Sequence, residues 1–218
     1  MREILLTILV AVLSYLLGCF STGTIISNAQ GVNIRNEGSK NTGASNVLRV
    51  LGLKSGIVCF LGDFTKAILA CWLGSLILPG ETFGISRFGT LLSGLMVILG
   101  HNWPVFYHFK GGKGVACSVA VIFFVSPLWG IISIVLCIAV IALTRYISLG
   151  SMTMLLTYMI FLFIAYPGQW FTCLFGVILF VLCVIRHRTN IVRLKNGTEN
   201  KIGQKVKPNQ DTSAEEKK

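Results

Sequence analysis

The sequence predicts an all-α integral membrane protein with seven transmembrane helices, its N-terminus outside and its C-terminus in the cytoplasm. Of its 218 residues, 54% are hydrophobic and 12% are charged, and the mean hydropathy is +0.76. A soluble domain is about a quarter charged and less than half apolar. The apolar residues are gathered into runs suited to a hydrocarbon core ~30 Å thick. The net charge of +11 comes mainly from alternate connections between these runs.

The candidate spans follow in order along the chain. Ile4–Ile26 is too long for the apolar region of a cleaved signal peptide and lacks an A-x-A-like site, so it is expected to be the first helix. Val115–Val125 is cut from the next run by Ser126-Pro127, and proline interrupts a helix. This short piece is either a separate helix or one arm of a kinked helix. The other expected spans are Gly56–Leu78, Phe88–Trp103, Leu128–Leu143, Ser148–Ala165 and Phe171–Ile185.

Charge placement decides between six spans and seven. The basic connections contain, in chain order, Arg35, Lys40, Arg49 and Lys54; Lys110 and Lys113; Arg145; and nine basic residues from Arg186 onward. If the chain reverses at Ser126-Pro127, all of these lie on one side, whereas Arg2 and Arg87 lie on the other and Lys66 lies inside a span. The positive-inside rule makes the basic side cytoplasmic. With six spans, the basic connections would no longer all lie on one side of the membrane.

One membrane domain is expected over residues 1–202. Residues 203–218 are polar and have no periodic apolar positions, so they are predicted to form a disordered cytoplasmic tail. The seven cysteines fall in apolar stretches without a CxxC pair, which favours buried free thiols over disulfides or a metal site. No metal or cofactor is expected.

The first basic connection has the composition of an anion-binding loop. In residues 31–49, glycine, serine, asparagine and threonine alternate with Arg35, Lys40 and Arg49. Such a backbone can turn successive N–H groups inward to form a nest for an anion. A flexible polar linker is an equally good interpretation of this loop alone.

The loop before Val115 is more specific. Gly111, Gly112 and Gly114 surround Lys113 immediately before a helix, which brings free N–H groups, the positive end of a helix dipole and an ammonium to one point. That combination suits a phosphate, and a glycine-rich hinge is the alternative. The pattern is not a Walker A loop, because Gly114 follows the lysine where Ser or Thr is required.

Polar residues also mark the other spans. His187 lies between Arg186 and Arg188, so a topology anchor is the simplest interpretation, but flanking cations also disfavour imidazolium and leave a neutral ring. Asp63 and Lys66 stand three apart in a span and are expected to pair, as a structural clamp or a buried functional group.

Three segments resemble the motifs of a known family. The runs GSKNTGASNVLRVLG, GHNWPVFYHFKGGKGVA and RHRTNIVRLKNG are similar, in order and spacing, to those of the bacterial acyl-phosphate-dependent glycerol-3-phosphate acyltransferases, the PlsY family. The similarity extends from Leu17 to about Glu199. It implies a multi-pass protein of the bacterial inner membrane with its site at the cytoplasmic face. It also implies transfer of an acyl group from acyl-phosphate to the 1-hydroxyl of sn-glycerol 3-phosphate, the first acylation in phospholipid synthesis.

The resemblance also implies roles for single residues. Ser39, His187 and Asn190 are expected to be catalytic. The residues expected to bind substrate or phosphate are Arg49, Lys113, Gly111, Gly112, Gly114, Asn41, Asn46, Ser148 and Ser151. Lys40 stands where the family usually has glycine, and Thr189 where it usually has an acidic residue, which puts a motif-three carboxylate in doubt.

Two other functions are compatible with basic, glycine-rich loops in a membrane protein. A transporter for a phosphorylated anion is disfavoured, because the spans show no evident inverted repeat and the motifs lie at one interface. A scaffold for anionic lipid has no need of glycine and asparagine at fixed positions. The expected partners are therefore the two substrates and the lipid bilayer, without nucleic acid.

Overall fold

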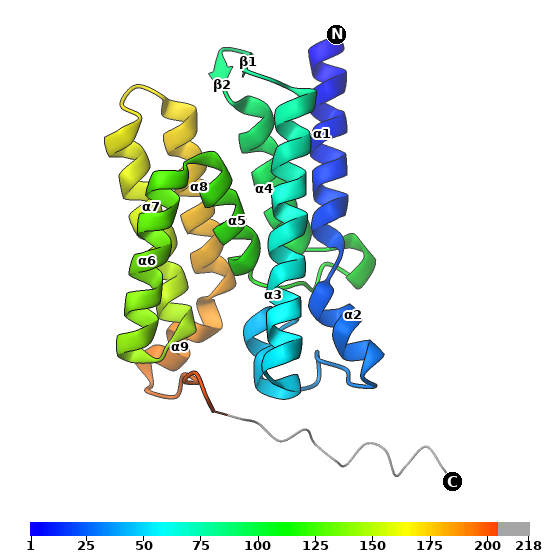
Figure 1. The fold of residues 1–218 in the computed structure, drawn as a ribbon, viewed down its shortest axis with the longest axis vertical. Coiled ribbons are helices and arrows are strands. Elements are labelled where there is room, and N and C mark those ends of the chain that lie inside the picture. Colours follow the sequence, from blue (N-terminus) through cyan, green and yellow to red (C-terminus); the bar gives the residue numbers. More distant parts are fainter. Residues whose placement is uncertain (205–218) are drawn as a thin grey trace.

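The computed structural model describes residues 1–204, which form a bundle of helices running up and down past one another (Figure 1). Helices α1 (Arg2–Cys19), α3 (Ala44–Ile77) and α4 (Phe88–Asn102) pack as one group. A second group contains α6 (Pro127–Thr144), α7 (Ile147–Ala165) and α8 (Trp170–Arg186), and α5 (Val115–Val125) lies between the groups. The shorter elements are α2 (Thr22–Ala29), β1 (Glu81–Thr82), β2 (Ile85–Ser86), η1 (Val105–Tyr107) and α9 (Arg188–Lys195). Nearly all of the predicted tail lies outside the described residues.

The expected helical membrane architecture is confirmed in outline. Four helical segments of residues 1–204 are long and apolar enough to cross a membrane: Arg2–Ala29, Ala44–Ile77, Pro127–Thr144 and Ile147–Ala165. The bent pair α8 and α9 makes a fifth candidate. Large apolar side chains such as Leu5, Leu143 and Ile164 are exposed on the outer faces of the helices, as in a protein solvated by lipid. The small antiparallel pair β1–β2 is a departure from an all-helical chain.

The break at Ser126-Pro127 separates two helices. The Ser126 amide closes α5 by donating to the Ile122 carbonyl at 3.1 Å, and Pro127 begins α6, where its missing N–H costs no helical bond. A Cβ on Gly130 would lie 2.6 Å from the Ile122 oxygen, so glycine permits close packing of the two helices. Figure 1 shows the chain reversing there. The structure therefore has a separate helix and not a kinked one.

The first apolar run is not one continuous helix. α1 ends at Cys19, Phe20 is extended (φ −66°, ψ 111°), and Ser21 starts α2 with its side chain accepting from the Thr24 amide. The carbonyls of Gly18 and Phe20 instead accept hydrogen bonds from Lys66 Nζ, at 3.0 and 2.5 Å. Because a distant lysine compensates the break, local periodicity did not predict it.

α3 begins earlier than expected. It starts at Ala44, inside the basic loop, and bends at Gly52, whose φ of 84° and ψ of −178° are rarely adopted by other residues. The arm over residues 44–51 therefore places Arg49 on a helix and not on a flexible linker. Figure 1 shows this arm with α2 and α9 at the end of the bundle opposite the start of α1.

The core lies between the two helix groups. Ala67 and Cys71 of α3, Val97 of α4, Val121 of α5 and Leu179 of α8 belong to one buried apolar cluster. All seven cysteines are buried free thiols, as predicted.

Candidate functional site

A cavity of about 440 Å³ lies at the end of the bundle that carries α9 and the 44–51 arm. One part of its wall is polar and basic, with Arg49, Lys113 and Arg193 among its residues. The other part is apolar and comes from α3, α5 and α6, including Ile57, Val119 and Ile138. The cavity therefore joins a cationic pocket to an apolar wall.

Most of the predicted site residues meet in this cavity. Its described wall contains Ser39, Asn41, Arg49, Lys113, Gly114, Ser148, Ser151, His187 and Asn190. Three others, Asn46, Gly111 and Gly112, are not among the described lining residues. The motifs lie up to 151 positions apart in the chain, from Ser39 to Asn190, so the helix packing brings them together.

Asn46 fixes the shape of the first basic loop through side-chain hydrogen bonds to its backbone. Its side chain is fully buried, and Nδ2 contacts the carbonyls of Ile34, Glu37 and Asn41, the last two at 3.0 and 2.9 Å. Its Oδ1 accepts from the Ser39 amide at 2.8 Å. These contacts use both N–H donors of the amide and one of the two lone pairs of its oxygen. The predicted role in substrate binding is therefore replaced by a role in shaping the loop that contains Ser39.

Replacing Asn46 with alanine is expected to lower the free energy of unfolding by about 1–3 kcal/mol, because several buried or partly buried backbone groups lose their partner. Thermal unfolding in detergent, compared with wild type, measures the loss. The matched change Asn36→Ala alters an exposed residue of the same loop and should leave the midpoint unchanged. Equal midpoints for Asn46→Ala and wild type would contradict this role.

The glycine loop differs from its expected function as a row of free amides. The Gly112 amide donates to the His101 carbonyl at 3.0 Å, so it is not available to a phosphate. The carbonyls of Gly111 and Gly112 accept from the Arg186 guanidinium at 2.9 and 2.6 Å. Gly114 does line the cavity, and its φ of 75° turns the chain into α5. The loop thus holds Lys113 at the start of α5, and of its three glycines only Gly114 is among the described lining residues.

Lys113 is the half-buried cation at the centre of the site. Its ammonium donates to Asn190 Oδ1. Burial, followed by the charge of Arg193, lowers its pKa to about 8, although the nearby Glu199 carboxylate raises it. Burial and the neighbouring cations disfavour the charged form of Lys113, and a bound anion such as phosphate stabilises that charged form. This is the behaviour expected of a lysine that binds phosphate.

His187 follows the last residue of α8 and presents a neutral ring. Nδ1 lies 2.9 Å from the Cys183 carbonyl. A carbonyl only accepts, so Nδ1 carries the proton and Nε2 is left as an acceptor. Burial, and then the Lys113 charge, lower the pKa of His187 to about 4. The ring is neutral as expected, but burial is the main cause and the neighbouring Arg186 contributes least among the stated causes.

Glu199 is the polar residue that the sequence patterns did not single out. Its carboxylate accepts from Asn190 Nδ2 at 2.6 Å, from Arg193 Nε at 2.8 Å and from Ser148 Oγ at 3.0 Å. Burial raises the pKa of Glu199, but these hydrogen bonds outweigh it and hold the pKa below its usual range. The only feature of the sequence that could have indicated Glu199 is its position shortly after a basic cluster. Arg193 was in that cluster without an assigned role.

The two departures from the family pattern lie away from the cavity wall as described. Lys40 is exposed and has a φ of 58°, a conformation that favours glycine. This conformation explains why glycine is usual there, and Lys40 is not among the described residues that line the cavity. Thr189 is exposed on α9. An acidic residue at that position would face away from the site, so its absence leaves the cavity chemistry unchanged.

Known proteins are similar to this chain over nearly its full length. A family model described as glycerol-3-phosphate acyltransferase matches residues 8–197. Glycerol-3-phosphate acyltransferase of Thermoanaerobacter sp. (strain X514) is 42% identical over 200 residues, covering 91% of this chain and 97% of that protein. The protein of the same name from Aquifex aeolicus is 38% identical over 192 residues, covering 88% and 96%.

Two solved structures are also similar to the chain. The crystal structure of the integral membrane glycerol 3-phosphate acyltransferase PlsY in its glycerol 3-phosphate form has a TM-score of 0.82 and 37% identity, covering 90% of this chain and 96% of that one. The lysophosphatidic acid form has a TM-score of 0.79 and 36% identity, covering 91% and 96%.

Proposed function

The chain belongs to the glycerol-3-phosphate acyltransferase family, and from this premise we propose that it uses acyl-phosphate as donor and the 1-hydroxyl of sn-glycerol 3-phosphate as acceptor. The products are 1-acyl-sn-glycerol 3-phosphate (lysophosphatidic acid) and inorganic phosphate. The observation that carries the proposal is the cavity itself, in which a cationic pocket continues into an apolar wall. The cations suit the phosphates, and the apolar wall suits an acyl chain that enters from the bilayer.

The reaction needs no covalent enzyme intermediate, because acyl-phosphate is an activated mixed anhydride. The acceptor oxygen forms a bond to the carbonyl carbon, and the bond from that carbon to the phosphate oxygen breaks, with its electron pair leaving on phosphate. Orienting two bound reactants in this way is worth about 7–11 kcal/mol of the barrier. The chain's main task is therefore to hold two phosphates and to aim one hydroxyl.

Residue roles follow from the positions in the cavity wall. Lys113 binds the phosphate of glycerol 3-phosphate, and Asn190 fixes the ammonium. Arg49 and Ser39 bind the phosphate that departs. His187 Nε2 accepts the hydrogen bond of the 1-hydroxyl and orients it. A ring with a pKa of about 4 is a weak base, whereas the leaving phosphate oxygen takes the electron pair of the broken bond. The proton of the hydroxyl therefore goes to the departing phosphate.

The proposal includes the orientation in the membrane. Helices α1 and α3 to α8 are taken as seven spans of a bacterial inner-membrane protein, with the N-terminus outside and the C-terminus in the cytoplasm. In support, the 44–51 arm and α9 lie at one end of the bundle, with the start of α1 at the other (Figure 1), and both segments contribute residues to the cavity wall. Those segments contain Arg49, Arg188, Arg193 and Lys195, and the cavity wall adds Lys113. The positive-inside rule places such a basic end in the cytoplasm.

Purified protein in detergent, given acyl-phosphate and glycerol 3-phosphate, is expected to release phosphate and form lysophosphatidic acid in equal amounts. Acyl-CoA is the matched donor, and it should give no product. Arg49→Ala, measured beside wild type, tests whether the turnover belongs to this cavity. Turnover with acyl-CoA alone would overturn the donor assignment. Uptake of glycerol 3-phosphate into vesicles without acylation would favour a transporter.

A further inference from the structure

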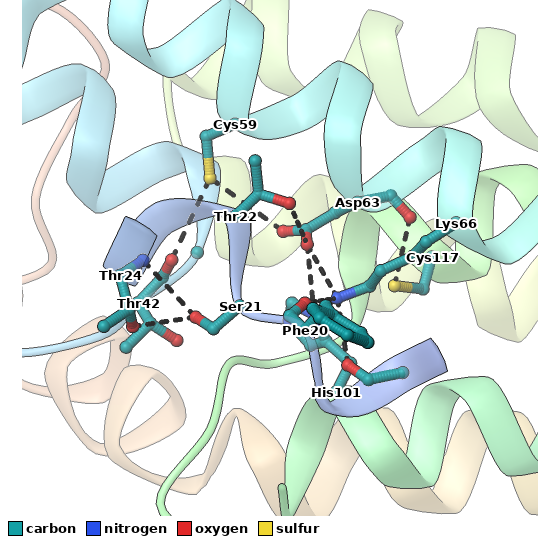
Figure 2. Close-up of polar contacts among 12 residues, drawn as sticks. Phe20, Ser21, Thr22, Thr24, Thr42, Cys59, Asp63, Lys66, His101 and Cys117 are labelled. Atoms are coloured by element: carbon teal, nitrogen blue, oxygen red, sulfur yellow. Dashed lines mark hydrogen bonds and ion pairs between the residues drawn. The ribbon is translucent and has the colours of Figure 1, made fainter. Parts of the chain in front are cut away.

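A buried polar cluster lies where α1, α3 and α4 meet (Figure 2). Lys66 Nζ is 2.8 Å from Asp63 Oδ1 and 3.0 Å from His101 Nδ1. The three residues are 1%, 7% and 6% exposed, for Asp63, Lys66 and His101 respectively. The pairing expected for Asp63 and Lys66 is thus confirmed, and His101 joins them from another helix. We name these residues the Asp63–Lys66–His101 cluster.

One part of the cluster stabilises the break between α1 and α2. Lys66 donates to the Gly18 and Phe20 carbonyls, which the helix break leaves without helical partners. Asp63 Oδ1 accepts from Thr22 Oγ1 at 3.1 Å, at the start of α2. Asp63 Oδ1 also lies 3.6 Å from His101 Nδ1, so the carboxylate contacts Lys66, Thr22 and His101. The cluster is a rigid support and not a solvated pair.

The other part of the cluster supports the glycine loop. The His101 carbonyl accepts from the Gly112 amide, and the His101 ring packs directly against the same residue. A Cβ on Gly112 would lie 2.0 Å from His101 Nε2, and one on Gly111 would lie 2.1 Å from the His101 carbonyl oxygen. Arg186 binds the carbonyls of Gly111 and Gly112. The loop is thus clamped between His101 and Arg186, one residue before Lys113.

The position of the cluster connects it to the site. Asp63 and His101 both line the cavity that contains Lys113. Placing a charged side chain inside a membrane span costs free energy, so such a residue usually has a function. An apolar packing contact would hold two helices together without placing three ionisable groups beside this loop.

We propose that Asp63 is a positioning residue that acts through His101 to hold the glycine loop, so that Lys113 faces the phosphate of the bound substrate. The inference rests on the proposed function, in which Lys113 binds glycerol 3-phosphate. It assigns to Asp63 an effect on substrate affinity that is separate from its effect on folding. Replacing the carboxylate removes the partner that holds His101 and Lys66 in register, and the loop then shifts relative to Arg186.

The test is the nearly isosteric variant Asp63→Asn, purified in detergent and assayed with acyl-phosphate and glycerol 3-phosphate. The KM for glycerol 3-phosphate is expected to rise on the order of tenfold, with a smaller change in kcat, by analogy with replacing the partners that orient metal ligands. Asp63→Glu retains the carboxylate and should recover part of this affinity. Thermal unfolding is measured in parallel, because a purely structural role lowers the midpoint but leaves the KM of the folded enzyme unchanged.

A matched control lies at the opposite end of the bundle, where Tyr166 follows α7 and its hydroxyl is 3.0 Å from Ser126 Oγ. Tyr166→Phe should alter stability without changing KM. If Asp63→Asn does not fold, His101→Gln is assayed for the same rise in KM. A KM within twofold of wild type in the folded variant overturns the inference. If wild type itself does not turn over glycerol 3-phosphate, the proposed function fails and this inference fails with it.

Coupling to the loop gives an independent readout. Gly112→Ala places a methyl group against the His101 ring, so it should also raise KM. If Asp63 acts through this contact, the double variant Asp63→Asn/Gly112→Ala should raise KM by less than the product of the two single effects. Independent, multiplicative effects would contradict the connection.

Discussion

Replacing Lys113 with alanine is expected to lower kcat/KM for glycerol 3-phosphate by about 10²–10³-fold, the loss typical of removing one preorganised charge-stabilising donor. The ammonium lies in a cavity wall with Arg49 and Arg193 and donates to Asn190. Its loss removes both a phosphate contact and the partner that orients Asn190. Steady-state kinetics with each substrate varied in turn, together with calorimetric titration of glycerol 3-phosphate, would measure it.

The matched variants are Lys113→Arg and Lys110→Ala. Lys110 is an exposed cation of the same loop, so its removal should change kcat/KM little. In wild type the pKa of Lys113 is about 8 in the empty site. As pH rises through that value the ammonium loses its charge, so KM for glycerol 3-phosphate should increase between pH 7 and pH 9. Lys113→Arg stays charged and should show a flat profile. Unchanged affinity in Lys113→Ala would exclude the loop from substrate binding.

Replacing His187 with alanine is expected to lower kcat by about 10²-fold, the loss that follows when a reacting hydroxyl is no longer held in position. The Cys183 carbonyl fixes the Nδ1 proton, so Nε2 is the only acceptor that the ring can offer to a hydroxyl. KM should change much less, because the phosphate contacts remain. Single-turnover measurements with saturating acyl-phosphate would separate the chemical step from binding.

His108→Ala is the control, because this histidine is exposed at the end of η1. The pH profile is a second test of the same assignment. Burial and the Lys113 charge lower the pKa of His187 to about 4, so activity should not decline as pH falls through 6.5, where an ordinary histidine becomes charged. Full turnover by His187→Ala, or an inflection near 6.5 that disappears in it, would contradict the neutral-ring role.

The sequence predicted several residues that line the cavity, because the patterns that single them out lie within short segments. Lys113 among glycines before a helix, and His187 with Asn190 one turn later, are local patterns with a physical meaning. The same local patterns misled where the partner is distant. Asn46 looked like a ligand-binding amide, but carbonyls of its own loop use its donors. Gly112 looked like a free amide, but the His101 carbonyl accepts its proton.

Glu199 shows why the rest of the site could be recognised only from the tertiary structure. No pattern in the residues around Glu199 predicts that it belongs to the site. Its carboxylate accepts a hydrogen bond from Ser148 on α7, which lies 51 positions earlier in the chain. In the same way, Lys66 and Asp63 were recognisable as a pair three residues apart. Their contacts with Gly18, Thr22 and His101 depend on how α1, α2 and α4 pack against α3.

The sequence by itself determined that this chain is a helical membrane protein with basic, glycine-rich segments suited to phosphate. Apolar runs, proline and charge asymmetry act over a few residues, and hydrogen-bond donors near glycine act within one loop. Only the tertiary structure decided which of those donors face the cavity and which support it. A buried amide or lysine takes the partners that packing brings within about 3 Å, and those partners come from segments far away in the chain.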